Sequence, residues 1–133
     1  MGKLKSILLI DDDEVTNYVN SILFKKADCC EKLEICQDGQ AALNFLNNCI
    51  AQRTHFPEII LLDINMPKMS GWEFIDEYIK IEKAYRQNTA VVMLTTSLNV
   101  KDEVFLQHYE EVRAFCHKPL SVGQINGLVR AYS

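Results

Sequence analysis

Five short apolar runs alternate along this chain with segments of helical periodicity. The runs cover residues 6–10, 33–36, 59–62, 90–94 and 112–116. Short, nearly continuous apolar runs are typical of strands that are buried on both faces. Strands that alternate with helices form a parallel sheet. Each helix carries the chain back along the sheet in a right-handed crossover, so the next strand runs in the same direction as the last. The sequence therefore predicts an α/β fold with a doubly wound, five-stranded parallel sheet.

Five helices are expected between and after these strands. The first begins at Glu14, and the third is expected to be long, from a capping box at Ser70 and Glu73 to about Tyr85. A weaker helix covers about residues 99–109, and a second capping box at Ser121 opens the last helix. In the first helix the apolar residues at spacings of three and four share one face, as in a helix that buries one stripe: Val15, Tyr18, Val19, Ile22 and Leu23.

Size and composition exclude several classes of protein. The 133 residues suffice for one domain, and no apolar run reaches the roughly 20 residues that span a bilayer, so we expect no membrane contact. The net charge is −4 and no run of Lys or Arg is present, which argues against direct nucleic-acid binding. The five cysteines are odd in number and lack metal-ligand spacing, so we expect reduced thiols in a cytoplasmic protein.

The residues that follow the strands are the candidates for chemistry, because ligands of such sheets bind beyond the carboxyl ends of the strands. An acidic cluster with Asp11, Asp12 and Asp13 follows the first strand, and Asp63 follows the third. Taken singly, Asp13 and Asp38 are explained as helix caps or turn residues. Several carboxylates that converge with a lysine at one sheet edge are not explained in that way.

The residue types at these strand ends favour phosphoryl chemistry. Crowded carboxylates repel one another unless a cation is present, and such oxygen ligands suit Mg²⁺. Lys118, after the fifth strand, would supply a point charge for a phosphoryl oxygen, and Thr95, after the fourth, a neutral donor. A remaining carboxylate would attack phosphorus and hold an aspartyl-phosphate.

Four stretches of the chain resemble the response-regulator receiver domain, the phospho-accepting module of two-component signalling, in the family's order and spacing. They are LLIDDD at 8–13, LLDINMPKMSG at 61–71, MLTTS at 93–97 and FCHKPL at 115–120. The resemblance covers essentially the whole chain, and the chain is similar to the single-domain, chemotaxis-type members of the family. It implies the flavodoxin-like (βα)5 fold with strand order 2-1-3-4-5, and one receiver domain over residues 1–133. Alternatively, the chain is a fragment and an output domain follows Ser133.

The resemblance also implies a role for each site residue. Asp63 is the expected phosphoacceptor. The expected Mg²⁺ site comprises Asp11, Asp12, Asp63 and the backbone carbonyl of Asn65. Thr95, Thr96 and Lys118 are expected beside the phosphoryl group, with the Lys118–Pro119 peptide bond cis. The expected switch residues are Thr95 and Phe115.

The implied function is transfer of a phosphoryl group from a histidine kinase or a histidine phosphotransfer protein to this chain. Phosphorylation is then expected to alter the surface formed by residues 99–109, the fifth strand and the last helix, which contacts an unknown downstream protein. Since Phe115 lacks a hydroxyl group, a switch at that position acts through packing. Such a protein catalyses only its own phosphorylation and dephosphorylation, so we do not expect an enzyme.

Two other functions were weighed against this one. A haloacid-dehalogenase-type phosphatase would use Asp11 as its nucleophile, with Thr95 and Lys118 as its later motifs. That superfamily places an acidic pair after its lysine, whereas nothing acidic follows Lys118. The phosphatase interpretation also leaves Asp63 unexplained. A flavin carrier shares the sheet topology, but carboxylates after the first strand would repel the flavin phosphate.

Overall fold

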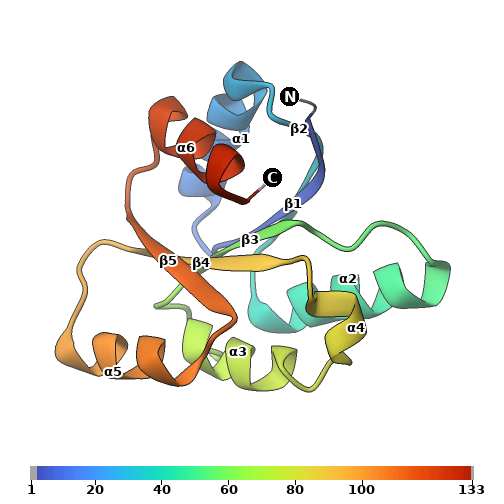
Figure 1. Ribbon diagram of the computed structural model, residues 1–133. Helices are drawn as coiled ribbons and strands as arrows, with labels where there is room; N and C mark the ends of the chain where they lie inside the picture. The colour runs from blue at the N-terminus through green and yellow to red at the C-terminus, as the bar shows by residue number, and fades with distance from the viewer. Residues whose placement is uncertain (1–2, 133) are drawn as a thin grey trace.

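The computed structural model describes residues 3–132, and its centre is a five-stranded parallel sheet (Figure 1). The strand order is β2-β1-β3-β4-β5, which confirms the predicted α/β fold. The strands are β1 (Leu4–Ile10), β2 (Cys30–Cys36), β3 (Ile59–Asp63), β4 (Ala90–Thr95) and β5 (Val112–His117). The helices are α1 (Glu14–Ala27), α2 (Gly39–Gln52), α3 (Gly71–Tyr78), α4 (Lys83–Arg86), α5 (Val100–His108) and α6 (Val122–Tyr132).

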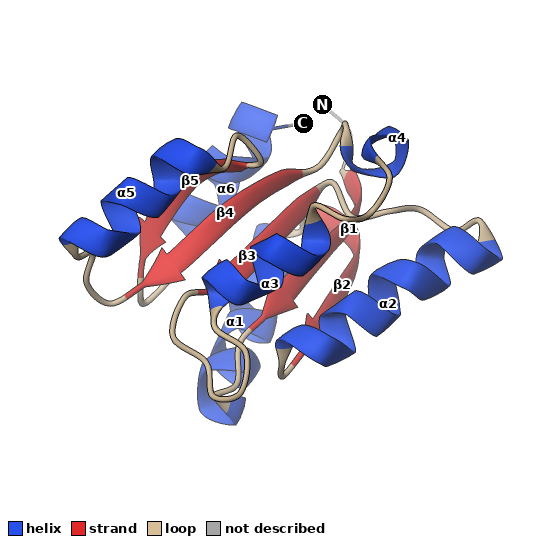
Figure 2. Cartoon of the chain, turned by 90° about the horizontal axis from the view of Figure 1, so that it is seen from below, coloured by secondary structure: helices blue, strands red, loops and turns tan. Residues whose placement is uncertain are grey.

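Helices cover both faces of the sheet, and each face has its own apolar layer. Helices α1 and α6 lie on one face, and α2, α3 and α5 lie on the other (Figures 1 and 2). Since side chains alternate along a strand, β1 gives Ile7 and Leu9 to the layer beneath α1 and α6. It gives Leu8 and Ile10 to the layer beneath α2 and α3. The sheet is thus buried on both sides, as its continuous apolar runs predict.

Polar side chains fix where the helices begin. Asp13 is the N-cap of α1 and Asp38 is the N-cap of α2, which confirms the interpretation of both as helix caps. Ser70 and Glu73 form the predicted capping box of α3. Ser121 and Gln124 exchange the same pair of hydrogen bonds before α6, at 2.8 and 3.1 Å. Each cap directly follows a strand or its loop, so the helices start close to the carboxyl ends of the strands.

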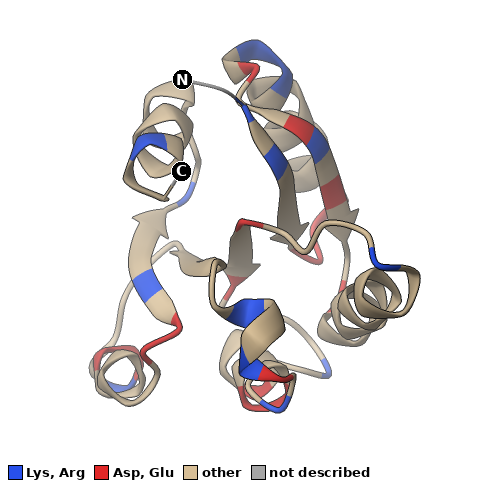
Figure 3. Cartoon of the chain, turned by 45° about the vertical axis from the view of Figure 1, so that its right-hand side comes forward, with Lys and Arg blue, Asp and Glu red and all other residues tan. Residues whose placement is uncertain are grey.

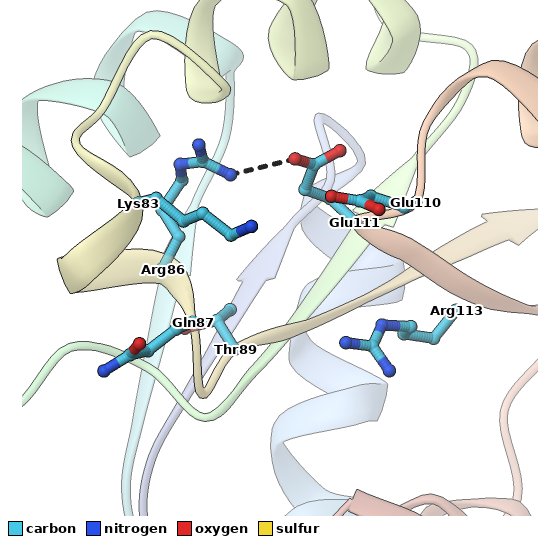
Figure 4. A pocket seen from close by; sticks show the side chains of 7 residues that line it. All are labelled: Lys83, Arg86, Gln87, Thr89, Glu110, Glu111 and Arg113. Carbon is cyan, nitrogen blue, oxygen red and sulfur yellow. Dashed lines mark hydrogen bonds and ion pairs between the residues drawn. The ribbon is translucent and has the colours of Figure 1, made fainter.

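The prediction of one long helix from Ser70 to Tyr85 is wrong, because α3 ends at Tyr78 and a separate short helix, α4, follows. Arg86 holds this second segment in place: its Nε donates to the Ile81 carbonyl at 2.7 Å and its Nη1 to Glu111 at 2.9 Å. The Arg86 guanidinium also lies over the Tyr78 ring, 5.6 Å from the centroid. A cavity of about 490 Å³ beside the Arg86–Glu111 pair lies near the amino end of β4 (Figure 4).

Helix α1 turns most of its apolar stripe toward solvent, whereas an amphipathic helix usually buries that stripe. The predicted stripe forms, but Val15, Tyr18, Val19 and Ile22 are 69, 69, 45 and 40% exposed. The side chains that α1 buries lie on the opposite side of the helix: Asn17, Asn20 and Phe24. The physical reason is visible at Asn17, whose amide donates to the Asp11 backbone carbonyl at 2.8 Å. That bond holds the side of α1 with Asn17 and Phe24 toward the sheet. Of the predicted stripe, only Leu23 is then partly buried, and the other four residues lie on the surface.

Basic and acidic positions are interspersed along the helices (Figure 3), in keeping with the absence of a basic run from the sequence. Across residues 3–132, every helix is too short or too polar to cross a membrane.

The orientation of α1 predicts unequal costs of truncating its two largest apolar side chains. We expect Phe24→Ala to lower the free energy of unfolding by about 3–5 kcal/mol, because it empties a buried site. Tyr18→Ala should cost less than about 0.5 kcal/mol, because that ring is mostly in solvent. Urea unfolding of both variants measures the difference, and a cost at Tyr18 that equals the cost at Phe24 would contradict this orientation.

Candidate phosphoryl-transfer site

Three aspartates meet where β1 and β3 end. The two strands are paired in parallel with Ile10 opposite Leu62, so Asp11 and Asp63 are next to each other at the same sheet edge. One carboxylate oxygen from each of Asp11, Asp12 and Asp63 lies within 4.8 Å of the other two. Asp11 and Asp63 are buried, whereas Asp12 is exposed. The structure thus brings together the three carboxylates that the sequence singled out.

A lysine from the loop after the edge strand β5 completes the cluster. Lys118 follows β5, and its Nζ lies 2.6 Å from Asp11 Oδ2 and 3.4 Å from Asp63 Oδ1. Its backbone N–H donates to the Thr95 carbonyl at 2.9 Å, which fixes the start of this loop against β4. The peptide bond between Lys118 and Pro119 is cis. The ammonium group therefore lies between two carboxylates that come from different strands.

Burial and the neighbouring charges shift the acid–base behaviour of the site. Burial raises the pKa of Asp63 to about 6, with the Lys118 ammonium acting in the opposite direction and Asp11 in the same direction. Burial alone would lower the pKa of Lys118, but its hydrogen bond and charge interactions with Asp11 and Asp63 outweigh burial and raise it above the ordinary value. The lysine thus stays charged, and its charge does not fully offset the effect of burial on the pKa of Asp63.

Backbone contacts hold the acidic loops in place. The N–H of Asn65 donates to Asp63 Oδ1 at 3.2 Å, and the N–H of Asp13 donates to Asp11 Oδ1 at 3.0 Å. Gly71 lies so close to the end of β3 that a Cβ there would be 2.8 Å from the Asp63 carbonyl oxygen. Only glycine fits at this position without movement of the backbone that bears Asp63.

Two of these supporting residues, Asn17 and Gly71, were not predicted from the sequence. Asn17 anchors the loop after β1 from beneath, and Gly71 permits the close approach of α3 to β3. A signal for Asn17 was present, because Asn17, Asn20 and Phe24 are spaced as one helix face opposite the apolar stripe. Gly71 was noted only as part of a motif.

The two threonines after β4 differ in environment. Thr95 is buried, and its hydroxyl donates to the Ser97 carbonyl and accepts the Ser97 N–H at 3.1 Å. Its strand neighbours β3, with Leu94 opposite Asp63, so Thr95 lies beside the acidic cluster with its hydroxyl bonded to its own loop. Thr96 is exposed.

Phe115 lies outside the acidic cluster. It is half-buried on β5 and packs against the layer beneath α3 and α5, with its ring edge-on to Trp72 at 6.4 Å between centroids. A link between Phe115 and Asp63 must therefore act through packing.

Buried aspartates at the carboxyl edge of a parallel sheet, paired with a lysine that follows the last strand, define a class of phospho-accepting signalling domains. Comparison with known proteins agrees: residues 7–130 match the family model described as "Response regulator receiver domain". The chain belongs to this family and is a receiver domain of two-component signalling. Nothing in the match supports the haloacid-dehalogenase alternative.

Individual relatives give the same picture. Response regulator Rcp1 from Synechocystis sp. is 31% identical over 95% of this chain and 84% of its own length. A two component response regulator from Cytophaga hutchinsonii has a TM-score of 0.88 and 32% identity, over 98% of this chain and 97% of that one. A two-component response regulator from Legionella pneumophila has a TM-score of 0.77 and 30% identity, with 97 and 99% covered.

The raised pKa of Asp63 predicts how its charge affects stability. A carboxyl group that binds its proton more tightly when folded loses stability as pH rises, here between about 4 and 6. In metal-free buffer, Asp63→Asn should therefore match wild type near pH 4 and exceed it by about 1–3 kcal/mol at pH 8. Thermal or urea unfolding across this pH range measures the gap. The exposed variant Glu103→Gln is the control, and a gap that does not grow with pH would contradict the prediction.

Proposed function

We propose that Asp63 accepts a phosphoryl group from a phosphorylated histidine of a partner protein. The supporting observation is the buried Asp63 carboxylate at the sheet edge, with the Lys118 ammonium 3.4 Å away and two further carboxylates beside it. A carboxylate oxygen of Asp63 forms the new bond to phosphorus. The bond between phosphorus and the imidazole nitrogen breaks, and its electron pair leaves with the imidazole.

Mg²⁺ is the metal that this donor set suits. Asp11, Asp12 and Asp63 offer only carboxylate oxygens, and the Asn65 backbone carbonyl is the fourth proposed protein donor. A divalent cation held there would neutralise negative charge on the phosphoryl oxygens and on the crowded carboxylates. The three aspartates thus both require a cation and supply the ligands for one.

Lys118 and Thr95 are proposed to contact the phosphoryl oxygens. The Lys118 Nζ already lies between Asp11 and Asp63, so it needs little movement to reach a phosphoryl oxygen. The Thr95 hydroxyl must first leave the Ser97 backbone. Thr96, exposed beside it, is positioned to limit access of water to the acyl phosphate. Movement of Thr95 gives room to Phe115, which is the proposed second switch residue.

The proposed output is a change of protein contact, without turnover of an outside substrate. We assign one receiver domain to residues 1–133, with a signalling surface formed by α5, β5 and α6 and a downstream protein as its target. Neither nucleic acid nor membrane is a proposed partner. The five free cysteines support a reducing compartment, the cytoplasm.

Intact mass measured after incubation with acetyl phosphate tests the function. We expect wild type with Mg²⁺ to gain one phosphoryl group that hydroxylamine removes. Asp63→Asn should gain none, and omission of Mg²⁺ should slow wild type at least tenfold, because the carboxylates then repel the donor. Phosphorylation that persists in Asp63→Asn would rule out this acceptor, and turnover of phosphate esters that depends on Asp11 would replace the proposal with a phosphatase.

We further propose that the exposed face of α1 binds the phosphodonor. This helix begins two residues after Asp12, so its apolar face starts beside the acidic cluster. A donor histidine must reach Asp63, and the protein that bears it must cover the surface around the cluster. Val15, Tyr18, Val19 and Ile22 have the spacing with which one helix packs along another. A helix of the phosphodonor is therefore the proposed occupant of this face.

The docking role predicts a selective defect in Tyr18→Ala. With a purified histidine kinase that phosphorylates wild type, transfer to the variant should be at least tenfold slower, because a central apolar contact is lost. The rate with acetyl phosphate should not change. Val104→Ala, an exposed apolar residue on α5, is the matched control and should accept from the kinase at the wild-type rate. Equal transfer to Tyr18→Ala and wild type would contradict the docking role.

A further inference from the structure

The single tryptophan of the chain is the centre of an aromatic cluster that joins three elements. Trp72, the second residue of α3, is buried. Its ring stacks on Phe105 and Tyr109, with centroids 5.1 and 5.9 Å apart, and meets Phe115 edge-on at 6.4 Å. Trp72 thus touches α5, the residue that follows α5, and β5. The aromatic cluster of Trp72, Phe105, Tyr109 and Phe115 is continuous between the start of α3 and the proposed signalling surface.

Trp72 also makes a buried polar contact with α5. Its indole N–H donates to Asp102 Oδ1 at 2.9 Å, and Asp102 is only 6% exposed. The other carboxylate oxygen accepts the Asn99 N–H at 3.3 Å, and the Asp102 N–H donates to Asn99 Oδ1 at 2.8 Å. One carboxylate therefore both caps α5 and binds Trp72. A buried hydrogen bond to a charged group is stronger than a neutral one and is costly to break on one side only.

This contact matters more because α5 is otherwise loosely attached. Asp102 is the only buried residue between Val100 and His108, and Val100 and Val104 are exposed. Phe105 and Leu106 are only partly buried. A second hydrogen bond between the same two regions, from the Tyr109 hydroxyl to Asp76 on α3, lies in solvent. The buried anchor of α5 is thus a hydrogen bond to α3, where most helices would have an apolar side chain.

At its other end, Trp72 is fixed to the phosphoacceptor strand. The preceding residue, Gly71, donates its N–H to the Ile64 carbonyl at 2.8 Å. Its Cα lies against the backbone of Asp63 and Ile64 with no space for a side chain. A displacement of the backbone just after Asp63 therefore shifts Trp72 directly. The path from Asp63 to α5 has three steps: Gly71, Trp72 and Asp102.

We propose that the Trp72–Asp102 hydrogen bond holds α5 in its unphosphorylated position and opposes phosphorylation of Asp63. The inference rests on the proposed function and makes Trp72 and Asp102 positioning residues. A contact that is stronger in one state biases the protein toward that state, and its removal favours the other. Loss of the bond should therefore free α5 and also make the phosphorylated state easier to reach. If the contact had only a structural role, its loss would free α5 without making phosphorylation easier.

Trp72→Phe and Tyr109→Phe make a matched pair for the test. Each keeps an aromatic ring and deletes one hydrogen bond between α3 and the α5 region, buried in the first variant and exposed in the second. In the unphosphorylated protein, backbone amides of residues 100–108 should exchange at least tenfold faster in Trp72→Phe. In Tyr109→Phe they should exchange within threefold of wild type. Both measurements use hydrogen exchange with mass detection, so no phosphoryl donor is needed.

The second arm measures the bias toward phosphorylation. With Mg²⁺ and acetyl phosphate, Trp72→Phe should gain its phosphoryl group at least threefold faster than wild type, and Tyr109→Phe at the wild-type rate. A slower or unchanged rate in Trp72→Phe overturns the proposal, as does unchanged exchange in α5. If wild type itself takes no phosphoryl group, the proposed function fails, and the exchange arm still decides whether Trp72 anchors α5.

Asp102→Asn is the second variant if Trp72→Phe does not fold. Its amide presents one oxygen to two donors, Trp72 Nε1 and the Asn99 N–H, so one of the two bonds is lost. We expect the same direction of change in both arms with smaller size. Wild-type exchange and phosphorylation rates in a folded Asp102→Asn variant would contradict the proposal.

Discussion

Burial of the Asp11 and Asp63 carboxylates side by side at one sheet edge is the constraint on which the rest of this structure depends. Parallel strands bring these carboxylates to one sheet edge, and burial makes their charges costly. The Lys118 ammonium offsets part of the cost, but burial of the Asp63 carboxylate still raises its pKa to about 6. A site with unbalanced negative charge attracts a divalent cation.

Helix α1 shows how the needs of the site decide the orientation of a neighbouring element. The loop after β1 leaves a backbone carbonyl that requires a donor, and Asn17 supplies it from the helix. Once Asn17 and Asn20 face the sheet, the apolar stripe can only face outward. The stability lost by exposing four apolar side chains is recovered in use if a partner covers them. Loop support and the proposed partner contact thus lie on opposite sides of one helix.

The sequence was sufficient for the sheet and for the charged cluster, since each depends on local pattern. Apolar runs mark strands, and the residues just after them must meet at one edge. It was insufficient where the outcome depends on distant contacts. Periodicity defines which residues of α1 share a face but not where that face points. Likewise, the end of α3 at Tyr78 and the Trp72–Asp102 bond, which joins residues 30 apart, arise from packing between elements.

The alternation of β1 between two apolar layers has a consequence for how this molecule opens. The same central strands contribute side chains to both apolar layers, the one beneath α1 and α6 and the one beneath α2 and α3. Loss of either layer would expose one face of the same central strands, which makes partial opening of the sheet costly. Helix α5 buries one residue, Asp102, and its apolar contacts through Phe105 and Leu106 are only partly buried. Opening of α5 alone is therefore expected to cost less free energy than opening of the sheet.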